Sequence, residues 1–272
     1  MVAGFQRYNV RYLRRRFSAV RVAGLERLPT GSAPVVVYLN HPGWWDPLVG
    51  ALLVHRALAD RRHWALIDAA ELERYAILKR LGFLGIERDS RAGARAFARI
   101  GDALGATPDA TLWFTPQGRF ADPRERPVAL APGLAHLARR VPHARYVPLA
   151  IEYPFREERL PEARLRIGEP WTPAEDVDAV SGAASDGASG PAPSIDALAG
   201  RFARSLESTM DALASDTIAH RDEAFETLLD GTRGVSLFYD AWRALGARLR
   251  GERFERGHAR DRTDAPGPGA TR

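Results

Sequence analysis

Short apolar runs alternate with stretches of helical periodicity along the chain from residue 34 onward. Val35–Leu39 is a continuous apolar run, which is typical of a strand buried on both faces of a sheet. Further strands are expected at residues 63–67, 83–87, 110–114 and 146–153, with a short edge strand at 165–167. This alternation predicts an α/β fold whose largely parallel or mixed sheet is flanked by helices.

Helical periodicity fills the segments between these strands. Asp46-Pro47 has the pattern of an N-cap followed by proline at the first helical position, so a helix is expected through about Leu58. Ser90 can cap another helix that runs to about Leu104. Further helices are expected within 71–81, 133–140 and 196–250. The last segment carries apolar residues at helical spacing, namely Leu198, Phe202, Leu206, Met210 and Leu213, followed by an aromatic cluster at 238–242.

The N-terminal residues predict an amphipathic helix of their own. If residues 5–20 are helical, one broad face is apolar and the opposite face is basic, with Arg16 misplaced. The apolar positions are Phe5, Tyr8, Tyr12, Leu13, Phe17 and Val20, and the basic ones are Arg7, Arg11, Arg14 and Arg15. Such a helix can lie in a membrane interface, or it can pack on the domain with its arginines solvated, and the two interpretations are compatible.

These patterns divide the chain into five parts. They are a basic N-terminal helix (1–21), an α/β core (22–173), a flexible insert (174–195), a C-terminal helical segment (196–250) and a disordered tail (251–272). The insert and the tail are rich in small, polar, proline or glycine residues and lack bulky apolar clusters. The α/β core is long enough to bury a hydrophobic interior of its own.

Charge is distributed unevenly along the chain. Of the 39 basic residues only Lys79 is a lysine, and the formal net charge is +5. Residues 1–30 hold seven arginines and one glutamate, so the remaining chain is close to neutral. A basic end on a near-neutral body indicates an anionic partner, either a phospholipid surface or nucleic acid. We expect no nucleic-acid partner, because no recognised binding motif accompanies the basic segment.

Other features of the chain narrow the class of protein. It has no cysteine, which excludes disulfides, thiolate catalysis and cysteine-based zinc sites, and its histidines show no metal-ligand spacing. Its apolar runs fall short of the roughly 18–20 residues that a membrane-spanning helix needs. The N-terminus lacks the pattern of a signal peptide. We therefore expect a cytoplasmic protein that is peripherally associated with the cytoplasmic face of the membrane.

Three polar clusters follow predicted strands directly. His41 and Asp46 follow the first strand, Arg88 follows the third, and Pro116-Gln-Gly-Arg119 follows the fourth. Ligands of open α/β sheets bind at the carboxyl ends of the strands, so these clusters are expected to converge on one site.

A histidine with a carboxylate five residues later can be held in a single tautomer. His41 Nδ1 would donate to Asp46, which leaves Nε2 free to accept a proton. Because no serine or cysteine lies near the pair, we expect His41 to act as general base on a hydroxyl of the substrate. The alternative is that Asp46 only caps a helix and His41 is an ordinary loop residue. Trp44 and Trp45 favour a site, since an acyl chain or a membrane would cover them.

The arginines of the other two clusters suit an anionic ligand. Arg88 and Arg119 can bind a phosphate through the planar fork of the guanidinium group, although either can also be one of many solvated arginines. Gly118 would let the backbone approach a ligand closely, or it only shapes a turn.

Four segments together resemble the glycerolipid acyltransferases, the H-x4-D family that includes the 1-acylglycerol-3-phosphate acyltransferases. In chain order they are Asn40-His-Pro-Gly-Trp-Trp-Asp46, Phe83-Leu-Gly-Ile-Glu-Arg88, Phe114-Thr-Pro-Gln-Gly-Arg119 and Val147-Pro-Leu-Ala-Ile151. Their order and spacing fit the four blocks of that family, and the resemblance covers roughly residues 20–170.

The resemblance implies an O-acyltransferase that moves a fatty acyl group from acyl-CoA or acyl-carrier protein to a hydroxyl of a lysophospholipid, glycerolipid or related lipid. It implies no cofactor, metal or covalent intermediate. His41 would be the base and Asp46 would orient it, while Arg88 and the third block would contact the acceptor. No feature of the sequence indicates an oligomeric state.

The third block departs from the family pattern, which is commonly Phe-Pro-Glu-Gly-Thr-Arg. Gln117 stands in place of the glutamate, and Arg119 follows Gly118 directly, without the intervening threonine. The shift re-aims the arginine, so the sequence favours an acceptor other than lysophosphatidate, such as a lipid or glycolipid hydroxyl without a phosphate monoester. A second interpretation is a non-catalytic lipid-binding or membrane-adaptor protein with this fold, against which the intact His41–Asp46 pair argues.

Overall fold

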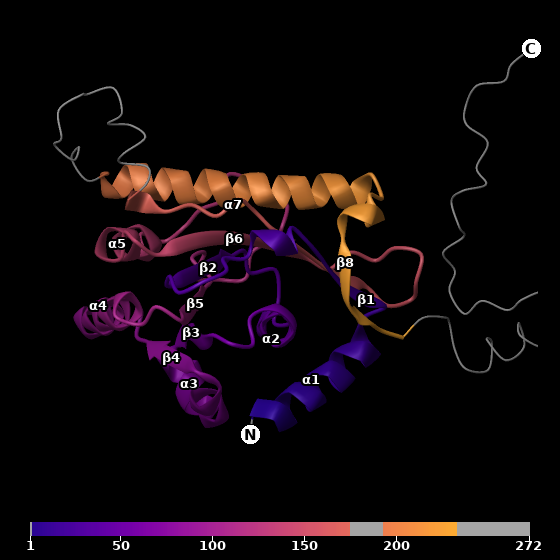
Figure 1. Cartoon of the computed structure of the whole chain (residues 1–272), viewed down its shortest axis with the longest axis horizontal. Coiled ribbons are helices and arrows are strands. Elements are labelled where there is room, and N and C mark those ends of the chain that lie inside the picture. Colours follow the sequence, from indigo (N-terminus) through magenta and orange to yellow (C-terminus); the bar gives the residue numbers. More distant parts are fainter. Residues whose placement is uncertain (1, 175–192, 233–272) are drawn as a thin grey trace, which may run out of the picture.

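The structure is a computed structural model that describes residues 2–174 and 193–232. Its centre is an eight-stranded mixed sheet in the order β4-β3-β5-β2-β6-β7-β1-β8 (Figure 1). Five of the seven strand pairs are parallel, and β6–β7 and β1–β8 are antiparallel. The strands are β1 (Ala19–Ala23), β2 (Val35–Leu39), β3 (Arg62–Asp68), β4 (Phe83–Ile86), β5 (Ala110–Phe114), β6 (Arg145–Glu152), β7 (Glu162–Ile167) and β8 (Glu226–Asp230). The predicted α/β fold class is confirmed.

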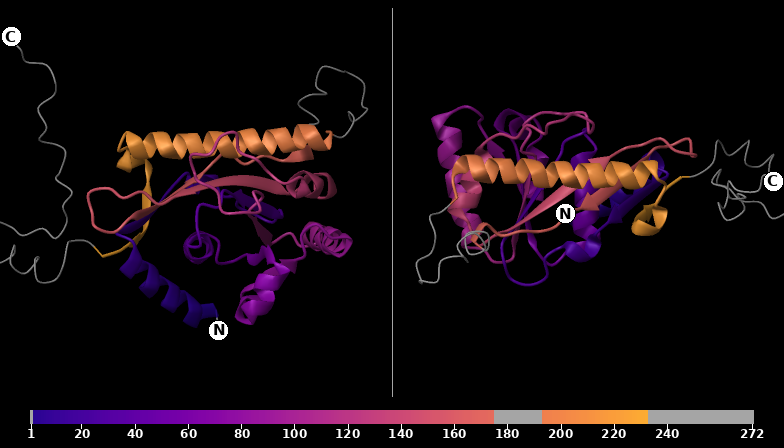
Figure 2. Two further views of the ribbon diagram at one scale, coloured as in Figure 1. Left: turned by 180° about the vertical axis from the view of Figure 1, so that it is seen from behind. Right: turned by 90° about the horizontal axis from the view of Figure 1, so that it is seen from above.

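Helices cover both faces of this sheet. One face is covered by α4 (Arg91–Gly105), α5 (Gly133–Arg140) and the long α7 (Ile195–Ile218), which lies across the sheet in both further views (Figure 2). On the side away from α7 lie α1 (Val2–Arg16), α2 (Asp46–Ala57) and α3 (Ala69–Arg74) (Figure 1). A 3-10 helix, η1 (Leu25–Arg27), follows β1.

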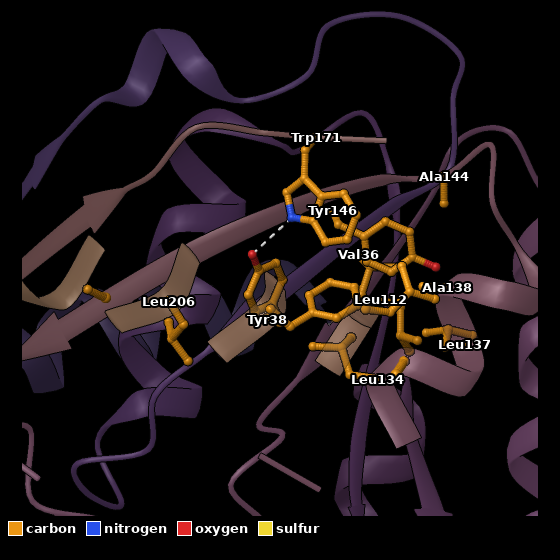
Figure 3. Close-up of a cluster of buried hydrophobic side chains, with 14 of the residues drawn as sticks. Val36, Tyr38, Leu112, Leu134, Leu137, Ala138, Ala144, Tyr146, Trp171 and Leu206 are labelled. Atoms are coloured by element: carbon orange, nitrogen blue, oxygen red, sulfur yellow. Dashed lines mark hydrogen bonds between the residues drawn. The ribbon is translucent and has the colours of Figure 1, made fainter. Parts of the chain in front are cut away.

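The central strand β2 separates two hydrophobic clusters, as its uninterrupted apolar run predicts. Val36 and Tyr38 belong to the cluster under α5 and α7, whereas Val35, Val37 and Leu39 face α1 and α2. Every residue of β2 is buried. In the cluster under α7, the indole of Trp171 donates a hydrogen bond of 3.2 Å to the hydroxyl of Tyr38 (Figure 3).

The N-terminal prediction needs one correction. The helix expected at 5–20 ends at Arg16, and Val20 lies in β1, between β7 and β8. The periodicity misleads because the apolar positions of a short buried strand continue the spacing of the preceding helix. The observed helix packs on α2 through polar contacts as well: Asn9 Nδ2 donates to the carbonyl of Leu48 at 2.8 Å, and Gln6 Nε2 donates to that of Ala51 at 3.2 Å.

The C-terminal segment is also not entirely helical. After α7 the chain forms a 3-10 helix, η3 (Asp222–Ala224), and then β8, which pairs antiparallel with β1. The strand expected as an edge at 165–167 is longer, spanning Glu162–Ile167, and lies inside the sheet between β6 and β1. The helix expected at 71–81 breaks at Tyr75 into α3 and a 3-10 helix, η2 (Ala76–Leu81). Most of the expected insert, the segment 233–250 and the expected tail lie outside the described residues.

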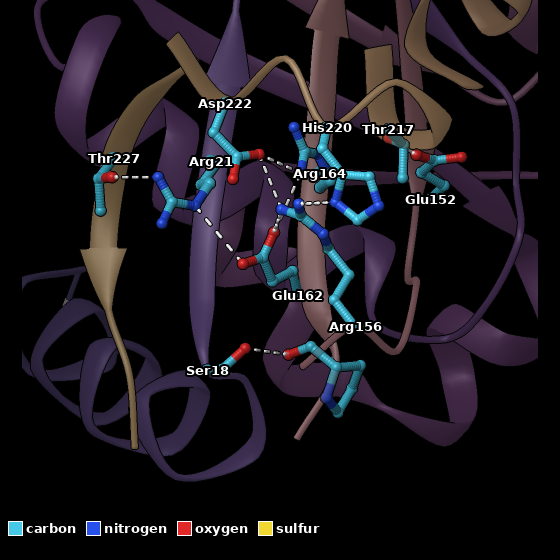
Figure 4. Close-up of polar contacts among 11 residues, drawn as sticks. Ser18, Arg21, Glu152, Arg156, Glu162, Arg164, Thr217, His220, Asp222 and Thr227 are labelled. Atoms are coloured by element: carbon cyan, nitrogen blue, oxygen red, sulfur yellow. Dashed lines mark hydrogen bonds and ion pairs between the residues drawn. The ribbon is translucent and has the colours of Figure 1, made fainter. Parts of the chain in front are cut away.

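A buried ionic cluster ties η3 to β7. Arg164 has a fully buried side chain and donates to Asp222 Oδ1 at 2.9 Å and to Glu162 Oε2 at 3.3 Å (Figure 4). Arg156 donates to the same Asp222 oxygen at 2.7 Å. The guanidinium carbon of Arg164 also lies 4.0 Å from the ring centroid of Phe225, at the entry to β8. Charge pairing and a cation–π contact therefore hold the last strand against the body of the sheet.

Candidate active site

The loop that carries the candidate site leaves β2 through a firmly anchored residue. Asn40 is buried, and its side-chain amide bonds both backbone groups of Ile151: Nδ2 donates to the carbonyl at 2.9 Å, and Oδ1 accepts from the N–H at 2.8 Å. Since β6 pairs with β2 in parallel, this bond joins the carboxyl ends of two neighbouring strands. His41 therefore starts from a backbone position that is tied to β6.

The predicted contact between the histidine and the aspartate is present. His41 Nδ1 lies 2.5 Å from Asp46 Oδ2, and the backbone N–H of Gly43 donates to the same oxygen at 3.3 Å. The Asp46 side chain is only 2% exposed, whereas that of His41 is 21% exposed. With Nδ1–H directed at the carboxylate, Nε2 is the ring nitrogen left to accept a proton.

Asp46 does not cap the helix, contrary to the sequence-based expectation. It is the first helical residue of α2, the capping position belongs to Trp45, and no side chain caps the helix. The carboxylate instead turns back into the loop toward His41. Its place at the helix N-terminus still favours its negative charge, because the helix dipole is positive there.

A tyrosine that the sequence reasoning missed completes the surroundings of the carboxylate. Tyr153 Oη donates to Asp46 Oδ1 at 2.5 Å. Burial, followed by the charge of Asp46 and this hydrogen bond, raises the pKa of Tyr153 well above 10, so the phenol remains a donor. The residue lies just beyond the end of β6. Its position at a strand end was the available signal, but the local sequence does not show that β6 pairs with β2.

The third predicted cluster reaches the site through its backbone and its glutamine. Gln117 Oε1 accepts from the backbone N–H of His41 at 3.0 Å, and the N–H of Ala121 donates to the carbonyl of His41 at 3.0 Å. The loop after β5 thus holds His41 from both sides of its backbone. Gly118 adopts φ 66°, a left-handed conformation that glycine tolerates best, and so shapes this loop.

The two arginines of the predicted phosphate site are occupied by other partners. Arg88 donates to the carbonyl of Gly118 and, at 3.2 Å, to Asp68 Oδ2. The backbone N–H of Ala70, followed by Arg88, lowers the pKa of Asp68. Arg119 pairs with Glu125 and donates to the carbonyl of Phe120 at 3.2 Å, within its own loop. Arg88 therefore converges on the third cluster as predicted, through a backbone contact, while Arg119 turns toward Glu125.

The adjacent tryptophans have different environments. Trp45 is partly buried and packs against Phe17 and Tyr12, with ring centroids at 5.1 and 5.7 Å. Trp44 packs against Trp45 in a tilted arrangement, with ring centroids 4.4 Å apart, and is 55% exposed. Phe120, a second residue that the sequence did not single out, is 59% exposed and lies 4.4 Å from the His41 ring, centroid to centroid. Two exposed aromatic side chains thus lie at the candidate site.

An open α/β sheet with a histidine–carboxylate pair at its strand ends is an arrangement suited to general-base catalysis. Residues 19–152 match the protein-family model described as Acyltransferase, so over that segment the chain is similar to the acyltransferase family. The match includes β1 to β6 and both members of the histidine–carboxylate pair.

A solved structure shares the fold. It is the 1-acyl-sn-glycerophosphate (LPA) acyltransferase PlsC from Thermotoga maritima, with a TM-score of 0.54 and 15% identity. The alignment covers 79% of this chain and 80% of that one. No curated protein gives a significant match to the chain.

Proposed function

We propose that this acyltransferase moves a fatty acyl group from acyl-CoA or acyl-carrier protein to a hydroxyl group of a lipid, with His41 as general base. The observation that carries the proposal is the 2.5 Å contact between His41 Nδ1 and Asp46, whose carboxylate is almost fully buried. His41 Nε2 would take the proton of the acceptor hydroxyl as its oxygen attacks the thioester carbonyl. Collapse of the tetrahedral intermediate would form the ester and break the carbon–sulfur bond, and the leaving sulfur would take the proton from His41 to give the free thiol.

Asp46 would serve this reaction in two ways. Its Oδ2 holds the imidazole in the tautomer with Nε2 unprotonated, and its negative charge stabilises the imidazolium that forms during the attack. The backbone contacts of His41 with Gln117 and Ala121 support the same assignment, because they restrict the position of the base.

For the acceptor we propose a lipid or glycolipid hydroxyl without a phosphate monoester. The pairing of Arg88 with Asp68 and of Arg119 with Glu125 supports this, since each guanidinium charge is offset by a carboxylate. A phosphate monoester would have to displace these contacts or find other cations. Gln117 is consistent with the same proposal, as its amide oxygen already accepts from the backbone of His41.

The acceptor is tested with purified protein, palmitoyl-CoA or palmitoyl-carrier protein, and three acceptors offered separately. These are lysophosphatidate, monoacylglycerol and a glycolipid with a free hydroxyl. The proposal expects ester formation with a neutral acceptor at a rate well above that with lysophosphatidate. Robust turnover of lysophosphatidate would refute the acceptor assignment, and absence of transfer to every acceptor would refute the reaction.

We further propose that the enzyme works at the cytoplasmic face of a membrane, on which α1 and the exposed aromatic residues of the site rest. Tyr8 of α1 is 61% exposed, and arginines surround it on the solvent side of the helix. Trp44 and Phe120 add exposed aromatic surface beside His41. Exposed aromatic side chains among cations suit an interface with anionic phospholipid. Among residues 2–174 and 193–232, no helix is both long enough and apolar enough to cross a bilayer.

A further inference from the structure

The carboxylate of Asp46 is shared between two side chains that follow different strands, His41 after β2 and Tyr153 after β6. Its Oδ2 faces His41 Nδ1, and its Oδ1 accepts from Tyr153 Oη, each at 2.5 Å. The Gly43 N–H adds a third donor at 3.3 Å. Because the Asp46 side chain is 2% exposed, these donors replace most of the water that would otherwise solvate the charge.

Tyr153 is itself held in place from two directions. Two residues earlier, both backbone groups of Ile151 are bonded to the Asn40 side chain, which fixes the end of β6 relative to the loop of His41. Its ring packs on Phe17, with centroids 5.6 Å apart, and Phe17 in turn contacts Trp45. The phenol thus approaches Asp46 along a constrained direction.

We propose that Tyr153 is a positioning residue of the acyl-transfer reaction, which holds the Asp46 carboxylate so that Oδ2 orients His41. The inference rests on the proposed function of His41. A carboxylate bonded on both oxygens cannot rotate about its Cβ–Cγ bond without losing one of two charge-assisted hydrogen bonds. The plane of the carboxylate therefore sets the direction of the imidazole, and with it the direction of Nε2.

The alternative is that Tyr153 is only a core tyrosine whose hydroxyl found an acceptor. The two roles differ in what the hydroxyl does for His41. If Tyr153 positions Asp46, loss of the hydroxyl leaves a buried carboxylate oxygen unsatisfied and frees the carboxylate to move, which changes the environment of the His41 Nδ1 proton. If Tyr153 only fills space, loss of the hydroxyl lowers stability alone.

The test compares Tyr153→Phe with Tyr146→Phe. Tyr146 lies on β6, the strand that Tyr153 follows, is buried, and donates to the carbonyl of Val141 at 3.2 Å in the cluster under α7. Each variant therefore removes one hydrogen-bonded hydroxyl, from the residue after β6 beside Asp46 or from β6 itself, remote from Asp46. Four quantities are measured for each: kcat, KM, the pH dependence of kcat, and the thermal midpoint. The downfield proton NMR signal of His41 Nδ1–H is followed as well.

For Tyr153→Phe we expect kcat to fall about 10- to 100-fold while KM changes little, because one charge-assisted hydrogen bond to the orienting group is lost. The acid limb of the pH profile moves to higher pH, since the charge of Asp46 is no longer shared with the phenol. The Nδ1 proton signal shifts. Tyr146→Phe retains the wild-type kcat, pH profile and signal even where its thermal midpoint falls.

The proposal is overturned if Tyr153→Phe keeps kcat, pH profile and proton signal, or if its losses match those of Tyr146→Phe. Should Tyr153→Phe fail to fold, 3-fluorotyrosine at position 153 retains the ring and makes the hydroxyl a stronger donor. An unmoved His41 signal in that protein would then contradict the positioning role. An inactive wild type would refute the proposed function, whereas the proton signal depends only on the geometry of the site and still decides the role of Tyr153.

Discussion

At the scale of single residues, the candidate site is organised by hydrogen bonds to His41 and Asp46. The imidazole is held through Asp46, and the backbone of His41 is held through Gln117 and Ala121. Sequence reasoning identified His41 and Gln117 because their clusters follow predicted strands, and Asp46 because it comes five residues after His41. It missed Tyr153 because the pairing that brings its strand end beside His41 joins strands more than 100 residues apart.

Two substitutions of Gln117 separate its role as a hydrogen-bond acceptor from the effect of a negative charge at that position. Gln117→Leu removes the acceptor for the His41 N–H, so we expect kcat to fall about tenfold as the loop loses its support. Gln117→Glu keeps an oxygen at the same place and should retain most of the activity. Steady-state transfer to the preferred acceptor measures both variants. Equal rates for the leucine and wild-type enzymes would show that this bond does not position the base.

Buried tyrosines predict a loss of stability at alkaline pH. Burial raises the pKa of Tyr38 from 10.0 to about 12, and burial also raises the pKa values of Tyr146 and Tyr153. The unfolded chain therefore releases these protons at lower pH than the folded chain. The stabilisation is fully present below pH 10 and is lost as the pH rises toward 12, by about 3 kcal/mol for Tyr38 alone.

Urea unfolding at pH 9 and pH 11 measures this effect. We expect a lower free energy of unfolding at pH 11, and a smaller decrease in Tyr38→Phe, which has no proton to lose at that position. An unfolding free energy that is the same at both pH values would contradict the assignment.

At the scale of elements, local sequence predicted the bounds of two central strands, one buried throughout and the other over its first three residues. Residues 35–39 and 110–114 form β2 and β5 with the predicted bounds, since both segments are almost entirely apolar and are bordered by polar or turn residues. The strands β1 and β8 escaped prediction because their stability comes from each other and from β7. Ala19 pairs with Glu162 on one side and with Asp230 on the other. A local sequence pattern cannot predict partners that lie so far along the chain.

The ionic cluster of Arg164, Glu162 and Asp222 is expected to stabilise the attachment of β8 to the sheet, and this can be tested. Arg164→Ala removes a buried cation from Glu162 and Asp222, and its ring contact with Phe225. We expect the free energy of unfolding to fall by about 3 kcal/mol. Arg62→Ala is the matched control, since Arg62 pairs with Asp109 on the surface with 69% of its side chain exposed, and it should cost less than about 1 kcal/mol. Equal values from urea titrations of the two variants would contradict a structural role for the cluster.

At the scale of the whole molecule, one face of the sheet is covered by a hydrophobic layer and the other carries the candidate site. The side of α7 is a closed hydrophobic layer around Tyr38, Tyr146 and Phe202. The opposite side carries α1 and α2, and α2 begins at Asp46. The basic helix and the candidate site are therefore neighbours, which supports a membrane-facing side. The sequence predicted the helix and its charge, while its docking on α2 through Asn9 needed the structure.

Vesicle binding tests the membrane-facing side directly. Replacement of Arg7, Arg11 and Arg15 by glutamine should weaken binding to vesicles with anionic phospholipid about 100-fold, as each cation near such a surface contributes roughly 1 kcal/mol. The matched control replaces Arg91, Arg95 and Arg99, which are exposed on α4, and should bind almost as the wild type does. Equal loss from both variants would indicate attraction by net charge rather than docking through α1.

The general-base assignment of His41 is the central claim, and one substitution tests it most directly. His41→Ala removes the imidazole and leaves Asp46 bonded to Tyr153 and Gly43. Single-turnover transfer of a radiolabelled acyl group to the preferred acceptor is compared with that of the wild type, with folding checked by circular dichroism. We expect a rate at least about 100-fold below wild type in a folded protein that still binds vesicles. A folded His41→Ala enzyme that transfers acyl groups at nearly the wild-type rate would contradict the general-base assignment.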